Sequence, residues 1–221
     1  TAENNLVSDV GNAIYMYLAD NCVVNKNRIS LVHASSFSIT GIYLAGSSGN
    51  VISSNKIGDC KGNGICANNG GRTLNAASTD NKITGNIINN TLNDGIYIGT
   101  GSTGTVISKN DVGVSNKSGI VVLDSKKCQV ISNKVSDCRL DGIYLKNIGD
   151  TDIKSNNVTT VKRYGVQVIS SQLKSLYGNT ITGNGNCGSS SPGFQAVSKT
   201  GCGIMEVPMP SILGTVQVLF W

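Results

Sequence analysis

The chain has 221 residues, a mass of 23.0 kDa and a formal net charge of +5, from 18 Lys and Arg against 13 Asp and Glu. Its length suits one domain, and its charged fraction of 14% excludes a disordered chain and a coiled coil. No dense Lys/Arg block occurs, so no nucleic-acid partner is predicted. No stretch approaches the roughly 18 consecutive apolar residues of a membrane span.

A repeat of about 23 residues runs through most of the chain. Each copy has an Asn followed two positions later by Ile or Val, with another apolar residue three positions before the Asn. The intervals between successive asparagines are 28, 31, 24, 23, 23 and 23 residues. The seven asparagines are Asn27, Asn55, Asn86, Asn110, Asn133, Asn156 and Asn179. Seven matches in one register indicate a repeat architecture.

A second motif keeps the same register. It is a Gly followed by Ile or Val, then any residue, then Leu, Ile or Val. Four consecutive copies lie nine residues after a repeat Asn. The series comprises Gly41, Gly64, Gly95, Gly119, Gly142 and Gly165. We expect each of these glycines to begin a strand, with the following Ile or Val turned toward the core.

Each repeat is predicted to form two or three short strands separated by turns. No helical period of about 3.6 residues occurs, which argues against helical and leucine-rich solenoids. The repeat therefore predicts a β-solenoid of about seven to eight coils, which stack at about 4.8 Å and bury a core that one coil cannot bury alone. We expect the repeat asparagines to adopt the left-handed conformation at turns and to form a hydrogen-bonded ladder.

The coil length, the Gly-Ile-Tyr-Leu strand and the Asn-x-Val turn resemble the right-handed parallel β-helix superfamily of pectate lyases, polygalacturonases, alginate epimerases and phage tailspikes. The resemblance covers roughly residues 5–182. It implies an all-β, right-handed parallel β-helix, a polysaccharide ligand, and an extracellular, secreted or virion-surface location. A tailspike-like assembly implies a homotrimer or packing against a further chain. These motifs specify the fold rather than the reaction.

The two ends of the chain depart from the regular repeat. Asn5 begins another Asn-x-Val match, so the chain is expected to start within a coil and to be a fragment or to pack against another chain. We expect coils over residues 1–182 and an irregular C-terminal coil over 183–221. Within the latter, residues 193–197 suggest a last strand, and the apolar tail from Met205 to Trp221 suggests a cap or an interchain contact.

One column of residues is expected to point outward from the glycine-led strand. Strand alternation assigns to it Tyr15, Tyr43, Cys66, Tyr97, Val121, Tyr144 and Gln167. Sugar rings stack on aromatic rows, and Tyr adds a hydroxyl group for hydrogen bonding. Strand propensity alone also favours Tyr at such positions. Tyr43, Tyr97 and Tyr144 are the predicted substrate-binding tyrosines.

Asp94 and Asp141 share a column in the turn before that strand, two coils apart. Their separation of roughly 9–10 Å is near the upper end of the carboxyl spacing in inverting glycosidases, about 6.5–9.5 Å. One carboxyl group would protonate the leaving oxygen and the other would activate water. The alternative is that both are simple turn formers, since Asp-Gly is a common turn pair. As a hypothesis, these two residues are the catalytic pair.

Basic residues stand one or two positions before this column. The candidate substrate-binding cations are Lys117, Arg139, Lys162 and Arg163. A uronate lyase or epimerase could use them in β-elimination, with Asp residues binding Ca²⁺. However, the sequence has neither the three or four clustered Asp of the pectate-lyase calcium site nor the Asp-Pro-His-Asp signature of alginate epimerases. No metal site is therefore predicted, and Ca²⁺ is a cofactor only of the lyase alternative.

The seven cysteines give no metal-binding pattern. Cys22 and Cys128 share one repeat column and Cys60 and Cys138 another, but neither pair lies on adjacent coils, so stacked disulfides are not expected. Cys187 and Cys202 are the best candidate bridge. The lone His33 is expected to be an ordinary turn or surface residue.

These observations favour a polysaccharide-binding β-helix that cleaves its ligand, as a phage tailspike depolymerase or a secreted glycoside hydrolase does. A non-catalytic structural or adhesive β-solenoid is the first alternative. A uronate lyase or epimerase is the second. Hydrolysis is favoured over elimination because the paired carboxylates are the clearer catalytic pattern.

Overall fold

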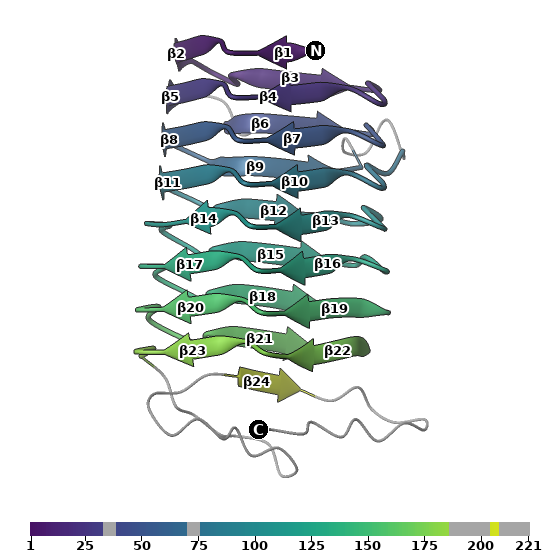
Figure 1. Cartoon of the computed structure of the whole chain (residues 1–221), viewed down its shortest axis with the longest axis vertical. Helices are drawn as coiled ribbons and strands as arrows, with labels where there is room; N and C mark the ends of the chain where they lie inside the picture. The colour runs from purple at the N-terminus through teal and green to yellow at the C-terminus, as the bar shows by residue number, and fades with distance from the viewer. Residues whose placement is uncertain (33–38, 70–75, 186–203, 208–221) are drawn as a thin grey trace.

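The computed structural model describes residues 1–32, 39–69, 76–185 and 204–207, and every element in them is a β-strand (Figure 1). The strands form three parallel sheets of eight strands each, which confirms the predicted all-β parallel β-helix. The chain visits sheet A, sheet B and sheet C in turn, and each complete visit to all three is one coil. None of the described residues forms a helix long and apolar enough to cross a membrane.

The strands of one sheet follow one another in order along the solenoid axis (Figure 1). Sheet A contains β1 (Ala2–Glu3), β4 (Val23–Asn25), β7 (Val51–Ser53), β10 (Lys82–Thr84), β13 (Val106–Ser108), β16 (Gln129–Ile131), β19 (Thr151–Lys154) and β22 (Leu173–Tyr177). Sheet B contains β2 (Leu6–Val10), β5 (Arg28–Val32), β8 (Lys56–Cys60), β11 (Ile87–Thr91), β14 (Asp111–Val112), β17 (Lys134–Ser136), β20 (Asn157–Thr159) and β23 (Thr180–Thr182). Sheet C contains β3 (Ile14–Tyr17), β6 (Thr40–Ala45), β9 (Asn63–Asn68), β12 (Ile96–Ile98), β15 (Ile120–Leu123), β18 (Ile143–Lys146), β21 (Val166–Ile169) and β24 (Ile204–Val207).

The core is a set of aliphatic columns, one residue per coil. In sheet C the residues after the motif glycines, including Ile96, Ile120 and Ile143, are fully buried as predicted. They stack in register on one another, and sheets A and B contribute matching Ile and Val columns. Burial of one such side chain stabilises the fold by about 1.5–3 kcal/mol. Stacking therefore builds the core that no coil has alone.

The predicted asparagine ladder is confirmed at the corner between sheets A and B. From Asn5 to Asn179, each side-chain amide nitrogen donates to the Oδ1 atom of the asparagine in the next coil, at 2.9–3.0 Å. The same Oδ1 atom also accepts the backbone N–H of the previous asparagine. Asn27 through Asn156 are almost completely buried, so these bonds are shielded from water.

The left-handed conformation lies one position earlier than expected. Asn27, Asn55 and the other repeat asparagines have no positive φ, whereas the residue before each does. These residues are Asn4, Lys26, Ser54, Gly85, Lys109, Ser132, Ser155 and Gly178. The ladder explains the difference. The asparagine side chain must point toward the asparagines of the adjacent coils, so the preceding residue makes the turn.

The motif glycines are required for space and not for a turn. None of Gly95, Gly119 and Gly142 has a positive φ. A Cβ atom at Gly119 would lie 2.3 Å from a methyl group of Val135 and 2.8 Å from the carbonyl oxygen of Gly142. The chain therefore passes close to the core at the corner between sheets B and C, where only glycine fits.

Sheet C continues beyond residue 182, because β24 pairs with β21. Its backbone register places Met205 opposite Gln167. Residues 193–197, where a strand was expected, and the tail after Val207 lie outside the described residues.

The ladder gives a direct stability test. Asn110→Ala is expected to lower the free energy of unfolding by about 3 kcal/mol, because it leaves the backbone N–H of Asn86 and the carbonyl of Ile83 without their buried partner. Urea denaturation followed by circular dichroism measures the change. Asn157→Ala, at an exposed asparagine of β20, is the control and should cost less than about 0.5 kcal/mol. Equal losses in both variants would contradict a special role for the ladder.

Candidate functional site

The outer face of sheet C carries the predicted tyrosine column. Its seven members pair in register from coil to coil, as expected: Tyr15, Tyr43, Cys66, Tyr97, Val121, Tyr144 and Gln167. The column is not uniformly exposed, however. Tyr15 is exposed, Tyr43, Tyr97 and Tyr144 are half-buried, and Cys66, Val121 and Gln167 are buried. Each half-buried tyrosine is thus separated from the next by a smaller, buried residue.

Tyr43 is held in place by two neighbours. Its hydroxyl group donates to Asn68 Oδ1 at 2.8 Å, and its ring lies 5.2 Å from the ring of Tyr15. Burial raises the pKa of Tyr43, so the phenol stays neutral. Asn68, which lies two residues after Cys66 at the end of β9, was not predicted as a site residue. Predicting its role would have required knowing how far the Tyr43 side chain reaches along the neighbouring strand.

Tyr97 lies at the centre of a cluster of ionisable side chains. Burial is the main cause of its raised pKa, and Cys66, Asp94 and Asp124 add to the rise. The ring leans over Gly99, where a Cβ atom would lie 2.9 Å from it. Burial, followed by the charge of Asp94, raises the pKa of the Cys66 thiol to about 12. Such perturbed groups gathered on one outer face are typical of functional sites.

Asp124 was missed by the sequence reasoning. It follows β15 with a φ of 47°, and its carboxylate accepts a hydrogen bond from Asn147 Nδ2 at 2.9 Å. The residue stands beyond the end of the glycine-led strand, in a corner without a sequence motif of its own. Like Asp94, Asp124 raises the pKa of Tyr97, and this effect exists only because the two coils are stacked.

Asp94 and Asp141 lie in one column at the corner between sheets B and C, as predicted. The Oδ1 atom of Asp94 accepts the backbone N–H of Ser118 at 2.9 Å, and that of Asp141 accepts the N–H of Tyr164 at 3.1 Å. Asn63, one coil before Asp94, makes the equivalent bond to the Asp94 N–H at 3.0 Å. Both carboxylates therefore link successive coils, whatever chemistry they perform.

The two carboxyl groups differ in their surroundings. Burial raises the pKa of both, with the hydrogen bonds from Ser118 and Tyr164 opposing the shift. Asp141 is 2% exposed, and its Oδ1 atom lies 3.6 Å from Arg163 Nε. Asp94 is more accessible; besides the Ser118 hydrogen bond, the charge of Lys117 lowers its pKa, without a salt bridge to it among the described residues. The arrangement therefore separates one more accessible carboxyl group from one buried, ion-paired group.

The predicted cations line the same corner. Lys117, Arg139 and Lys162 are exposed. Arg163 is half-buried and already engaged, because it approaches Asp141, donates to Gln167 Oε1 at 3.2 Å and lies 5.7 Å from the Tyr164 ring centroid. The structure thus brings three free-standing cations and one structural arginine beside the Asp column.

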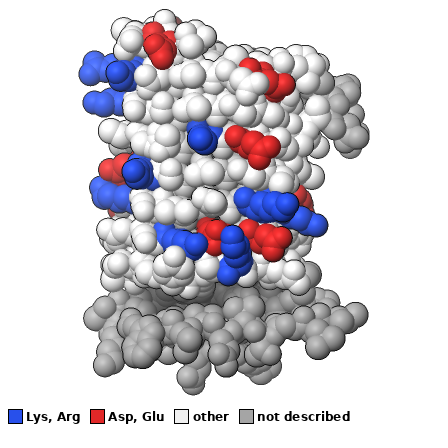
Figure 2. All heavy atoms as spheres, turned by 45° about the vertical axis from the view of Figure 1, so that its right-hand side comes forward, with Lys and Arg blue, Asp and Glu red and all other residues white. Residues whose placement is uncertain are grey.

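The opposite corner, between sheets C and A, has a different character. Figure 2 shows this side with Lys, Arg, Asp and Glu scattered among uncharged side chains, and no cluster of one sign dominates it. The candidate site is therefore defined by the sheet C face and the corner that precedes it.

The cysteines give no second site within the described part of the chain. Cys22, Cys60, Cys66, Cys128 and Cys138 are all free thiols, and the last four are buried, in line with the expected small apolar role. No three His, Cys, Asp or Glu side chains converge anywhere in the described residues. His33 and the candidate bridge between Cys187 and Cys202 lie outside the described residues.

Comparison with known proteins identifies the architecture. A family model described as right handed beta helix region matches residues 1–112 and 40–202. The solved structures that resemble the chain include the Dettilon tailspike protein (gp208), with a TM-score of 0.61 and 20% identity over 92% of this chain and 41% of that one. They also include a mutant of the periplasmic alginate epimerase AlgG (0.56, 15%, 94% and 51%) and the A-module of Azotobacter vinelandii mannuronan C-5 epimerase AlgE6 (0.54, 14%, 92% and 58%).

At these identities the likeness concerns the fold. The chain spans about half the length of the solved structures it matches. No curated protein matches the chain in sequence.

Asp94→Asn separates the coil-linking role of Asp94 from its charge. Asparagine keeps the acceptor oxygen, as Asn63 shows in the same column. The wild-type pKa is raised above the usual 3.8, so the carboxyl group's favourable contribution is present below about pH 3.8 and is lost as pH rises through the raised pKa. Thermal melts should therefore show equal stability near pH 3.5 and a more stable variant at pH 7.

Asp94→Ala is the matched control, since it removes the acceptor and should be about 1–3 kcal/mol less stable than Asp94→Asn at every pH. A variant that is less stable than the wild type at pH 7 but equally stable near pH 3.5 would show instead that the bond to the Ser118 N–H needs the carboxylate charge.

Proposed function

Because the chain belongs to the right-handed β-helix family, we propose that it binds a polysaccharide along the outer face of sheet C. The observation that supports this proposal best is the tyrosine column. In it, Tyr43, Tyr97 and Tyr144 recur at every second coil and are half-buried. At about 4.8 Å per coil, these rings are spaced at about 9.6 Å. An extended chain molecule of repeating units suits such a spaced array better than a compact ligand does.

The chemistry of the face suits sugars. Half-buried tyrosines offer a ring face for stacking and a hydroxyl group for hydrogen bonds. The exposed Lys117, Arg139 and Lys162 add positive charge along one edge, which favours a polysaccharide bearing anionic groups. Two of the similar structures are named as epimerases of alginate and mannuronan, which are polysaccharides. An extracellular or virion-surface location and a trimeric assembly belong to this proposal.

The tyrosine column is tested by glycan retention. Tyr97→Ala and Tyr144→Ala should each weaken retention roughly fivefold, equivalent to about 1 kcal/mol for one lost ring contact. Affinity electrophoresis through gels containing bacterial polysaccharides measures this loss. Tyr177→Ala, at an exposed tyrosine on sheet A, is the control and should retain glycan as the wild type does. Unchanged retention in both sheet C variants would remove the binding face from the proposal.

Hydrolysis of the bound glycan is the second part of the proposal. It is favoured by two carboxyl groups of raised pKa that stand beside Tyr97 and Tyr144, two coils apart. Asp94, which has no ion-pair partner in the described chain, would donate a proton to the leaving oxygen. Asp141, paired with Arg163, would act as the base for water. The separation of about 9.6 Å, from two coils of about 4.8 Å, is at the upper limit of the roughly 6.5–9.5 Å found in inverting enzymes and well above the roughly 5–5.5 Å of retaining ones.

The hydrolytic step is tested by product release. Asp94→Asn and Asp141→Asn should each abolish the release of reducing ends from a polysaccharide. The fold should be retained, because an asparagine oxygen can still accept the hydrogen bond from the backbone N–H of Ser118 or Tyr164. Asp111→Asn, at an exposed carboxylate of sheet B, should cleave normally. If both column variants keep activity, Asp94 and Asp141 are not the catalytic pair and this hydrolase assignment fails. If the wild type itself releases no reducing ends, the non-catalytic adhesive β-solenoid becomes the function.

The lyase or epimerase alternative needs a different site. The described residues contain no convergent group of three acidic or histidine ligands, so they do not fit the Ca²⁺ cluster that this alternative invokes.

A further inference from the structure

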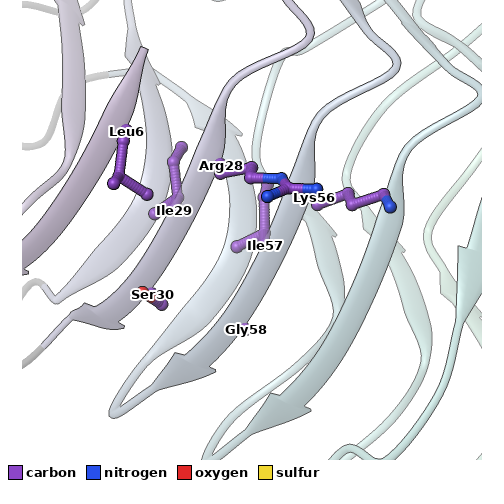
Figure 3. Close-up of a pocket in the computed structure, with 7 residues that line it drawn as sticks. All are labelled: Leu6, Arg28, Ile29, Ser30, Lys56, Ile57 and Gly58. Carbon is purple, nitrogen blue, oxygen red and sulfur yellow. The ribbon is translucent and has the colours of Figure 1, made fainter. Parts of the chain in front are cut away.

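A separate feature lies on the outer face of sheet B, in the first coils of the solenoid. Strands β2, β5 and β8 enclose an open hollow of about 300 Å³ (Figure 3). Its base is formed by Ser30 of β5 and Gly58 of β8, which occupy the same outward column on adjacent strands. A serine and a glycine have so little side chain that the sheet is almost bare at this point. Ile29 and Ile57 lie beneath it and are buried. The hollow is on a different sheet from the tyrosine column.

Two cations border this hollow. Arg28 and Lys56 face each other in register on adjacent strands, and both are exposed. Figure 3 shows Arg28 extending from β5 toward β8, so that its guanidinium group ends beside the stem of Lys56. Like charges placed directly opposite on neighbouring strands are destabilising. The pair therefore has an electrostatic cost that a bound anion would relieve.

Neither cation has an acidic partner within the described residues. The same outward column shows the ordinary solution farther along, where Lys134 Nζ lies 3.1 Å from Asp111 Oδ2. Asp59, at the far end of β8, is engaged by the side chain of Asn90. The two cations that line the hollow therefore keep their positive charges without an ion-pair partner in the described part of the chain.

The hollow also has an apolar wall. Leu6, one coil before Arg28 in the same column, is 77% exposed, the largest exposure among the large hydrophobic side chains described. A leucine beside an arginine offers an apolar surface to a ligand whose charged end meets the guanidinium group. The combination distinguishes this hollow from a plain cationic surface.

We propose that this hollow binds a phosphate or sulfate monoester whose ester group carries an apolar portion. The planar guanidinium group of Arg28 donates two parallel hydrogen bonds to the tetrahedral anion. Lys56 turns its flexible stem back to supply the second charge, and Ser30 offers a hydroxyl group. The apolar portion lies against Leu6. The site does not depend on the polysaccharide-binding face.

Binding is tested on the whole chain with hexyl phosphate, hexyl sulfate, inorganic phosphate and inorganic sulfate as probes, by calorimetric titration. Hexyl phosphate or hexyl sulfate should bind more tightly than the matching inorganic ion. Arg28→Gln and Lys56→Gln should each raise the dissociation constant about tenfold, the loss of one charge-assisted contact. Lys134→Gln is the matched control from the same column and should bind as the wild type does. Leu6→Ala should weaken the hexyl esters but not the inorganic ions.

The fold of each variant is checked by urea denaturation, in which Lys56→Gln should be no less stable than the wild type because it removes like-charge repulsion. The proposal is overturned if no probe binds the wild type, or if Arg28→Gln and Lys56→Gln bind as Lys134→Gln does. It is also overturned if the hexyl esters bind no better than the inorganic ions. Tyr97→Ala should leave this binding unchanged, so failure here and failure of the polysaccharide proposal are distinguishable.

Discussion

The side-chain amide bond between asparagines of successive coils is the constraint on which the rest of the structure depends. Each bond fixes two coils at one corner, so the strands on either side must stack in register. Register in turn places aliphatic residues above one another in the core and outward residues in straight columns. Because these bonds are buried, a group that loses its partner cannot form a hydrogen bond to water instead. The loss therefore lowers the free energy of unfolding by more than the loss of a surface hydrogen bond does.

Straight columns explain how a stack of short coils presents one extended line of side chains, such as the face proposed to bind polysaccharide. A residue type repeated at one position becomes a line of identical groups, as with the half-buried tyrosines of sheet C. A residue changed in one coil becomes a local feature, such as Gly58, which opens a hollow beneath Arg28. The same scaffold therefore offers two kinds of surface on different sheets, one for the long ligand that we propose and one for the small ligand that we propose.

Much of the fold followed from the sequence because the repeat reports register directly. The period of Asn110, Asn133 and Asn156 predicted the ladder, and the glycine series predicted sheet C and its outward column. Other features depend on the neighbouring coil and not on local sequence. The half-burial of Tyr43, the coil-linking bond of Asp94 and the proximity of Asp124 to Tyr97 all arise from stacking. A single coil carries no signal for them.

The ladders also give the solenoid a direction. In the asparagine ladder every side chain donates toward the next coil, so its amide dipoles are aligned in series and strengthen one another. In the column of Asn63, Asp94 and Asp141 the backbone of each following coil donates backward to the side chain before it. The two corners are thus polarised in opposite senses, and the ends of the stack are chemically unlike. Coils can be added to such a stack in only one orientation, because an inverted coil would bring acceptor against acceptor.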